Sequence, residues 1–275
     1  MALARVALVA SSYLPRVGGV EEHVRHVARE LRRRGHEVVI WAVEQGDDVP
    51  EQADGILLRY LPCPLPTRSV GGVLSFAGSF AKAWTAWQAA WRTDRPEVLH
   101  VHCFGPNGAY ATALARRRGL SLLYSHHGET FMDAHQAFDT SALLRRSLRV
   151  TLRRAAAVTS CSAYAAADLE RFGLAPDQVQ VVFNGVDLTE PVGRRPDGMP
   201  ARYVAGVGRL VEVKGFENLI TAFALVADEV PDVDLVIGGD GPQRAALAGL
   251  ARRRGLSLLY SHHGETFMDA HQAFD

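Results

Sequence analysis

Short apolar runs alternate with helical patterns along residues 1–188, and this alternation limits the folds open to the chain. Val6 to Ala10 is an apolar run of strand length, and apolar residues then recur at helical spacing up to Leu31. Arg32 to Arg34 and then Gly35 follow, a pattern typical of a helix end. Because strand and helix alternate repeatedly, we expect a doubly wound α/β unit with a parallel sheet. The expected strands are Val6 to Ala10, Val38 to Val43, Val98 to His102, Leu120 to Ser125, Ala156 to Ser160 and Val179 to Phe183, with helices near 20–34, 107–118, 140–154 and 162–172.

Residues 189–200 interrupt the alternation and are expected to form a linker. The stretch contains three prolines and two glycines and has no apolar periodicity. A second β-α series follows, and we expect a first domain over 1–188 and a partial second domain over 201–254. The expected elements of the second series are a strand at Tyr203 to Val207, a helix over 216–227, a strand at Val233 to Ile237 and a helix that begins at Asp240-Gly241-Pro242.

Residues 250–275 repeat residues 114–139 without a single change. Structural repeats keep the pattern that buries one face of each unit, and this does not require identity at exposed positions. We therefore interpret the second copy as a joining artefact or a recent recombination; a genuine tandem insertion is the alternative. Under the first interpretation the second domain is incomplete. We then expect Leu256 to Tyr260 to add one strand to its sheet, and the chain to be poorly ordered beyond about residue 261.

The charge balance excludes one large class of partner. Lysine and arginine number 30 together, as do aspartate and glutamate, so the basic field that binds nucleic acid is absent. Cys63, Cys103 and Cys161 form no C-x-x-C pair, and no signal peptide or transmembrane stretch is evident. These features favour a cytoplasmic protein. Peripheral attachment to the inner face of a membrane stays open.

An apolar segment over residues 70–92 bears on that attachment. Its aromatic residues Phe76, Phe80, Trp84, Trp87 and Trp91 recur at helical spacing. One interpretation is a stripe that faces the core. The other is a surface that meets a lipid-linked acceptor or a membrane interface, where tryptophan is common.

Two places in the sequence carry groups suited to phosphate. Gly18 and Gly19 lie between a strand and a helix N-terminus, where free N–H groups and the helix dipole favour an anion. A tight turn without a ligand is the alternative. Arg209 and Lys214 follow the first strand of the second domain, and Lys214 is one of only two lysines in an arginine-rich chain. Two cations there favour an anionic ligand, since arginine can bind oxygens in a bidentate way and lysine supplies a compact charge; a pair of solvated loop side chains is the alternative.

A dinucleotide site is not expected after this strand. Gly206-Val207-Gly208 begins like a dinucleotide fingerprint, but Val211 stands at the third glycine position. We therefore expect no NAD.

Histidines gather at the ends of two expected strands. His127 follows Leu122 to Ser125, at the strand end where open α/β sheets bind ligands, and its imidazole can donate a hydrogen bond or relay a proton. Capping of the strand end is the alternative. His100, His102, His126 and His127 also suggest zinc, because H-x-H on a strand places both rings on one face. No cysteine or acidic residue has a spacing that supports such a site, so we expect no metal.

Four segments together resemble glycosyltransferase family 4, the group 1 glycosyltransferases. They are residues 12–21 (SYLPRVGGVE), His126-His127-Gly128, Asn184-Gly185-Val186-Asp187, and residues 208–215 (GRLVEVKG) with Gly238-Gly239-Asp240-Gly241-Pro242.

The resemblance implies the GT-B fold, in which two Rossmann-like domains face each other across a cleft. It also implies transfer, with retention, from a nucleotide diphosphate sugar to a hydroxyl acceptor, with no obligatory metal and no other cofactor. By the same resemblance, His127 contacts the donor sugar or the reaction centre. Gly18 and Gly19 would bind the donor, and Arg209 and Lys214 would bind its diphosphate.

The second domain departs from the family's pattern. Family members continue past the G-D-G-P loop into an E-x-x-x-x-x-x-x-E segment that holds the donor's sugar and ribose, whereas Glu265 is the single glutamate after Gly241. We therefore expect little or no transferase activity from the chain as it stands. Two other functions stay open: a nucleotide-sugar epimerase of the same fold, and a non-catalytic fragment or binding module.

Overall fold

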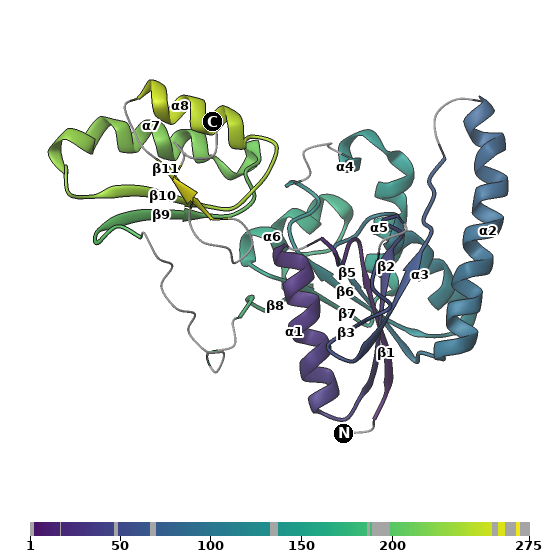
Figure 1. Cartoon of the computed structure of the whole chain (residues 1–275). Coiled ribbons are helices and arrows are strands. Elements are labelled where there is room, and N and C mark those ends of the chain that lie inside the picture. Colours follow the sequence, from purple (N-terminus) through teal and green to yellow (C-terminus); the bar gives the residue numbers. More distant parts are fainter. Residues whose placement is uncertain are drawn as a thin grey trace. The chain divides into compact units, whose positions relative to one another are not determined.

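The chain divides into two compact units, Met1–Val186 and Asp187–Asp275 (Figure 1). The computed structural model describes residues 3–16, 18–46, 49–66, 70–132, 137–185, 188, 199–254, 258–261 and 268–269.

The first unit contains an eight-stranded sheet in the order β3-β4-β2-β1-β5-β6-β7-β8, and its paired neighbours run parallel except for β3 beside β4. The strands are β1 (Arg5–Ala10), β2 (Glu37–Val43), β3 (Gln52–Ala53), β4 (Ile56–Leu61), β5 (Val98–His102), β6 (Ser121–His126), β7 (Ala157–Ser160) and β8 (Gln180–Val181). The helices are α1 (Gly19–Arg33), α2 (Val70–Asp94), α3 (Pro106–Arg118), α4 (Ala137–Thr140), α5 (Ala142–Arg154) and α6 (Ala163–Asp168), with 3₁₀ turns at Leu169–Phe172 and Pro176–Gln178.

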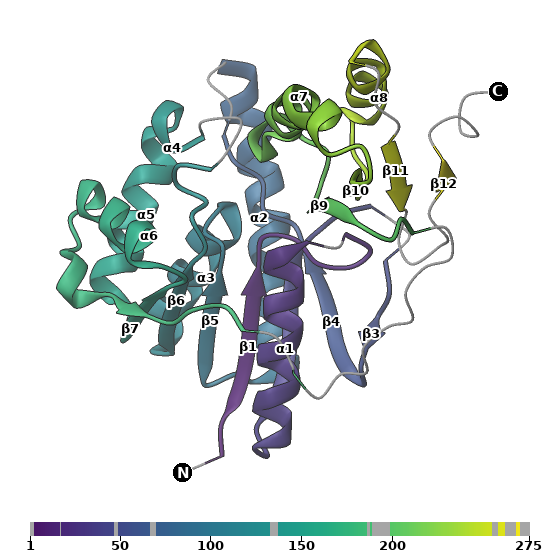
Figure 2. The same cartoon turned by 90° about the vertical axis from the view of Figure 1, so that its left-hand side faces the viewer.

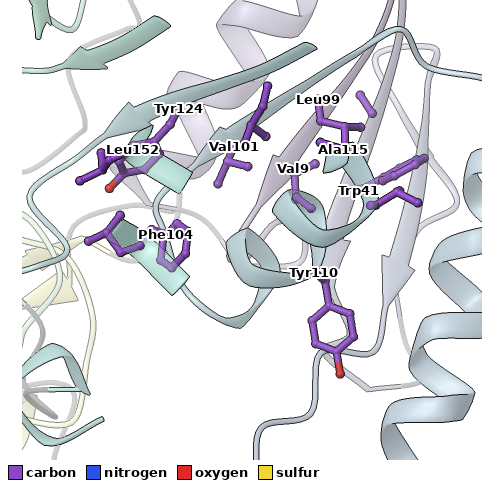
Figure 3. Packing of buried hydrophobic residues seen from close by; sticks show 14 of the residues in the cluster. Val9, Trp41, Leu99, Val101, Phe104, Tyr110, Ala115, Tyr124 and Leu152 are labelled. Carbon is purple, nitrogen blue, oxygen red and sulfur yellow. The ribbon is translucent and has the colours of Figure 1, made fainter. Parts of the chain in front are cut away.

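Helices cover both faces of this sheet, which is why the central strand β1 is apolar from Val6 to Ala10. In β1, Ala7 and Val9 point into a cluster that includes Trp87 of α2 and Leu114 of α3. The alternate residues of β1 pack with Val24 and Ala28 of α1 on the opposite face. Figure 2 shows α1 in front of β1, and Figure 3 shows Val9, Leu99 and Val101 packed in the first cluster with Trp41, Tyr110 and Tyr124. A strand buried on both faces reads as a continuous apolar run.

The strand order reverses at β1. The chain moves from β1 outward through β2 to β4, and then returns to place β5 on the other side of β1. In open α/β sheets, the crevice at the carboxyl ends of the strands beside such a reversal is where ligands bind. The carboxyl ends of β1, β5 and β6 therefore mark the place to look for a site.

The second unit contains a four-stranded sheet in the order β12-β11-β10-β9, with β12 antiparallel to β11. Buried residues of α7 and α8 pack with Leu235 and Ile237 of β10. The elements are β9 (Tyr203–Val207), a 3₁₀ turn at Glu212–Lys214, α7 (Phe216–Val226), a 3₁₀ turn at Ala227–Glu229, β10 (Asp234–Gly238), α8 (Arg244–Arg253), β11 (Leu258–Ser261) and β12 (Met268–Asp269).

The sequence-based elements are largely confirmed, with three differences. A hairpin of β3 and β4 was not expected; its turn is Asp54-Gly55, and both residues have positive φ (52° and 69°), as a two-residue hairpin loop requires. The last strand of the first unit was expected over Val179 to Phe183, but only Gln180 and Val181 pair with β7. The helix expected to begin at Asp240 begins instead at Arg244.

Two expectations concern the end of the chain. The strand expected at Leu256 to Tyr260 is present as β11, which pairs parallel with β10. The expectation of poor order beyond residue 261 falls outside the described residues, apart from 268–269.

Candidate functional site

Alternation along β5 sends its two histidines toward α1. Leu99 and Val101 belong to the cluster beneath α2 and α3, so His100 and His102 lie on the opposite face, which α1 covers. His102 is the last residue of β5 and is fully buried, and its register partner on β1 is Ala10. The H-x-H pattern thus places one imidazole at the carboxyl end of a central strand.

The next strand brings His127 to the same edge. Ser125 of β6 is in register with His102, and its Oγ atom lies 2.8 Å from Nε2 of His100 and 2.7 Å from Oγ1 of Thr159. His127 comes two residues after Ser125, so its ring joins the same side of the sheet, and Nε2 of His127 lies 3.4 Å from Nδ1 of His102.

The side chain of His126 lies on the opposite face of the sheet from those of Ser125 and His127. It is fully buried, and its Nε2 atom lies 2.8 Å from Oγ1 of Thr130 and 3.6 Å from a carboxylate oxygen of Glu129. The four histidines that suggested zinc from the sequence are therefore not one group.

A third histidine reaches the cluster from α1. His23 lies one turn inside this helix, and its ring centroid is 4.8 Å from that of His127 and 5.4 Å from that of His102. One ring nitrogen from each of His23, His102 and His127 lies within 4.8 Å of the others. We refer to these three residues as the histidine cluster.

Burial keeps these imidazoles neutral. Desolvation, with smaller contributions from neighbouring histidines, lowers the pKa of His100 to about 4 and the pKa of His102 well below its usual value. Desolvation also lowers the pKa of His127 to about 4, although the nearby Glu129 carboxylate acts in the opposite direction. Burial and the neighbouring His26 lower the pKa of His23, while a hydrogen bond with the Asn184 side chain raises it. At neutral pH each ring therefore has one N–H donor and one lone pair.

Glu129 fixes the loop that carries His127. Its side chain is only 9% exposed and accepts hydrogen bonds from the backbone N–H of His127 at 2.8 Å, the hydroxyl of Tyr124 at 2.7 Å and the backbone N–H of Phe104. Burial and the Glu129 carboxylate raise the pKa of Tyr124 well above its usual value, so this hydroxyl keeps the proton that it donates. One carboxylate thus links the residues that follow β5 to those that follow β6.

Gly18 and Gly19 lie where the sequence predicts, at the N-terminus of α1. Gly18 is the N-cap residue and has no side chain to cap the helix. A Cβ atom on Gly18 would lie 2.7 Å from a carboxylate oxygen of Glu21, whereas one on Gly19 would meet nothing within 4 Å. Glu21 also accepts a hydrogen bond from Ser12. The open approach to the helix N-terminus is therefore over Gly19.

Arg209 and Lys214 lie in the second unit, on the loop between β9 and α7, and both are exposed. The loop is fixed to the G-G-D-G-P segment by backbone hydrogen bonds from Leu210 to Asp240 (2.8 Å) and from Gly208 to Gly238 (2.9 Å). Gly239 has φ 141°, and a Cβ atom there would lie 1.9 Å from the carbonyl oxygen of Gly208. The glycines of this segment therefore let two loops pack against each other beneath the two cations.

The aromatic segment over 70–92 is part of α2, and it is only partly buried. Trp87 is 1% exposed and packs in the core, as the first interpretation predicts, whereas Phe80 is 41% exposed. Phe76, Phe80 and Trp84 also line an apolar pocket of about 310 Å³ together with Tyr110 and Leu144. Among the described residues, none of the helices is long and apolar enough to cross a membrane.

Two residues of the site were not singled out from the sequence. His23 lies three residues after Val20 and four before Val27, so it falls on the apolar face of α1. A polar residue on that face could have been noticed in the sequence. Glu129 had no such signal, because its role depends on Phe104, which lies 25 positions away in the sequence.

Comparison with known proteins gives matches over both units. Residues 17–190 match the family model described as Glycosyltransferase Family 4, and residues 197–265 match the one described as Glycosyl transferases group 1. One subunit of human phosphatidylinositol N-acetylglucosaminyltransferase is 26% identical over 257 residues, which cover 90% of this chain and 50% of that protein. Glycogen synthase of Mycobacterium tuberculosis is 28% identical over 274 residues, which cover 90% of this chain and 64% of that protein. The chain thus spans 50% to 64% of the length of these curated relatives.

Solved structures resemble the chain more weakly in sequence. Sucrose-phosphate synthase from Thermosynechococcus elongatus matches with a TM-score of 0.68 at 18% identity, over 98% of this chain and 72% of that one. The Anabaena protein HepE in complex with UDP-glucose matches with a TM-score of 0.63 at 18% identity, over 94% of this chain and 69% of that one. These likenesses concern the fold, and they confirm the GT-B fold expected from the sequence.

Proposed function

The chain belongs to glycosyltransferase family 4, and on this basis we propose that it transfers a sugar from a nucleotide diphosphate sugar to a hydroxyl group, with retention at the anomeric carbon. One observation carries the proposal: His127 lies at the carboxyl edge of the sheet, beside the strand reversal at β1 and near the N-terminus of α1. A sugar donor needs both a polar contact for its ring and a place for its phosphates, and this edge offers both.

His127 acts in this proposal as a neutral imidazole. Because its pKa is lowered to about 4, the ring is not an imidazolium at neutral pH and cannot serve as a strong acid. Its N–H group instead donates a hydrogen bond to a hydroxyl of the donor sugar. Glu129 holds the His127 backbone by the 2.8 Å hydrogen bond, so the ring is oriented before the substrate arrives.

In this proposal, Arg209 and Lys214 of the second unit bind the diphosphate. Arg209 and Lys214 make no salt bridge within the part of the second unit that the structure describes, so both charges are free to meet phosphate oxygens. Negative charge grows on the diphosphate as its bond to the sugar breaks, and cations aimed there stabilise the transition state more than the ground state. In the first unit, Gly19 leaves the N-terminus of α1 open to an anion.

We further propose that this 275-residue chain binds the nucleoside diphosphate but turns over slowly. The E-x-x-x-x-x-x-x-E segment of the family is absent, and Glu265 stands alone after Gly241. Interactions with the donor's ribose and sugar would therefore be missing, whereas the cations that meet the diphosphate are present.

The test has two parts on the full chain. Calorimetry with UDP, ADP and GDP should show that at least one of them binds; a folded protein that binds none would contradict the proposal. A chimera in which a relative's segment with the glutamate pair replaces residues 250–275 should then release nucleoside diphosphate faster than the parent chain. Product analysis without an acceptor separates transfer from epimerisation, because an epimerase changes the donor sugar and needs no acceptor.

A further inference from the structure

The histidine cluster has the composition and spacing of a metal site. His23, His102 and His127 come from α1, β5 and the residue after β6, and one nitrogen from each lies within 4.8 Å of the others. Three protein ligands with a fourth position left open to water or another ligand is a common arrangement for zinc. Imidazole nitrogen is also a ligand type that suits Zn²⁺ and its neighbours in the first transition series.

The distances agree with this interpretation. Two nitrogens that each lie about 2.05 Å from a tetrahedral ion are about 3.3 Å apart. Nδ1 of His102 and Nε2 of His127 are 3.4 Å apart, which is close to that separation and long for a hydrogen bond between two rings. His23 is half-buried, and its nitrogen would have to move closer to the other two by rotation of the side chain.

We propose that His23, His102 and His127 together bind a divalent transition-metal ion of the Zn²⁺ class, with one coordination position open. The ion would occupy the space beside Nε2 of His127, the residue that is proposed to contact the sugar. Reversible inhibition of transfer by Zn²⁺ is therefore a consequence that rests on the proposed function, whereas ion binding itself rests on the geometry alone.

The experiment uses the full chain, stripped of metal with a chelator and titrated with Co²⁺. A four-coordinate histidine site gives visible d–d absorption without the near-ultraviolet sulfur-to-cobalt band that a cysteine ligand adds. We expect one equivalent of Co²⁺ to produce this spectrum, and Zn²⁺ to displace it.

His23→Ala is the decisive variant, because it removes one ligand from a helix surface without opening the core. Co²⁺ affinity should fall at least about tenfold, since even residues that only orient metal ligands are worth about 10–100-fold. His26→Ala, on the same helix but outside the cluster, should bind as the parent does. His23→Gln serves as the second variant if circular dichroism shows that the alanine variant is unfolded.

Two outcomes would overturn the proposal. One is a parent chain that gives no visible Co²⁺ spectrum. The other is a folded His23 variant that keeps it, which would assign binding to others of the eleven histidines. Because the readout is absorption, it does not depend on turnover, so failure here would leave the proposed transfer untouched, and failure of transfer would leave ion binding untouched.

Discussion

Nδ1 of His102 lies 3.4 Å from Nε2 of His127, although His102 ends β5, His127 follows the last residue of β6, and the two are 25 positions apart in the sequence. Parallel pairing of β5 and β6 brings them together, because strands that run in the same direction end at the same edge of the sheet. A site assembled in this way depends on the register of two strands and on the loops that follow them. Substitutions at its residues should therefore change the stability of the first unit as well as ligand binding.

The first prediction concerns acid. Burial lowers the pKa of His100 and His127 from 6.5 to about 4, so between these values the unfolded chain binds more protons than the folded one. The histidine contribution to stability is fully present above pH 6.5 and is lost as the pH falls toward 4. Each such histidine should lower the free energy of unfolding by up to roughly 1.4 kcal/mol for each pH unit in this window.

Urea unfolding of the metal-free protein, followed by tryptophan fluorescence, measures this effect. All four tryptophans lie in the first unit, so the signal reports that unit alone. Measurements between pH 6.5 and 5 avoid most of the titration of ordinary carboxylates. A free energy of unfolding that stays constant over this range would contradict the lowered pKa values, and His127→Asn should reduce the slope.

The second prediction concerns Glu129. Glu129→Gln replaces a buried carboxylate that accepts from the backbone of Phe104 and His127 and from the Tyr124 hydroxyl. A glutamine keeps one acceptor oxygen and turns an NH₂ group toward donors, so we expect a loss of about 2–3 kcal/mol in the free energy of unfolding. The same fluorescence-detected denaturation checks it. Glu51→Gln, on an exposed carboxylate of the same unit, should change little, and equal effects in the two variants would refute the role given to Glu129.

Most of the fold could be predicted from the sequence, because apolar runs and helix ends are local signals. The hairpin of β3 and β4 was not expected, although Asp54-Gly55 is a strong hairpin signal and Ile56 to Leu61 is mostly apolar. The beginning of α8 was placed too early because Asp240-Gly241-Pro242 looks like a helix start, whereas backbone hydrogen bonds hold that segment against Leu210.

The site could be predicted only in part. His127, Gly18 and Gly19 are next to strand ends and a helix start, which the sequence marks. His23 and Glu129 matter through contacts between separate segments, and no local pattern records those contacts. Sequence spacing could not indicate the metal site proposed above, since its third residue comes from a helix 79 positions before His102 (102 − 23).

The third prediction concerns a partly buried ion pair at the other end of the first sheet. Asp94 is 7% exposed at its side chain and accepts from Arg59 at 2.5 Å and from Nε1 of Trp41 at 2.8 Å. Asp94→Ala leaves the guanidinium and the indole N–H without their partner, so we expect a loss of about 3 kcal/mol in the free energy of unfolding. Glu30→Ala, which removes an exposed carboxylate beside Arg33 and Arg34, is the control and should shift the urea midpoint much less. A midpoint equal to that of the parent in the Asp94 variant would show that the pair contributes nothing.

The fourth prediction separates the two lysines. Lys214→Ala should weaken binding of the nucleoside diphosphate that binds the parent chain about tenfold or more, because a cation that meets phosphate oxygens directly contributes well over 1 kcal/mol. Lys82→Ala, an exposed position on α2, removes the same charge from the chain and should leave affinity unchanged. The pair of variants therefore distinguishes a local contact from the effect of net charge.

Raising the salt concentration should weaken binding of the nucleoside diphosphate to the parent and to Lys82→Ala. It should weaken binding to Lys214→Ala less, because fewer charged contacts remain to be screened. Calorimetry measures all three proteins, and equal affinities for the parent and Lys214→Ala would remove Lys214 from the donor site while leaving Arg209 to be tested in the same way.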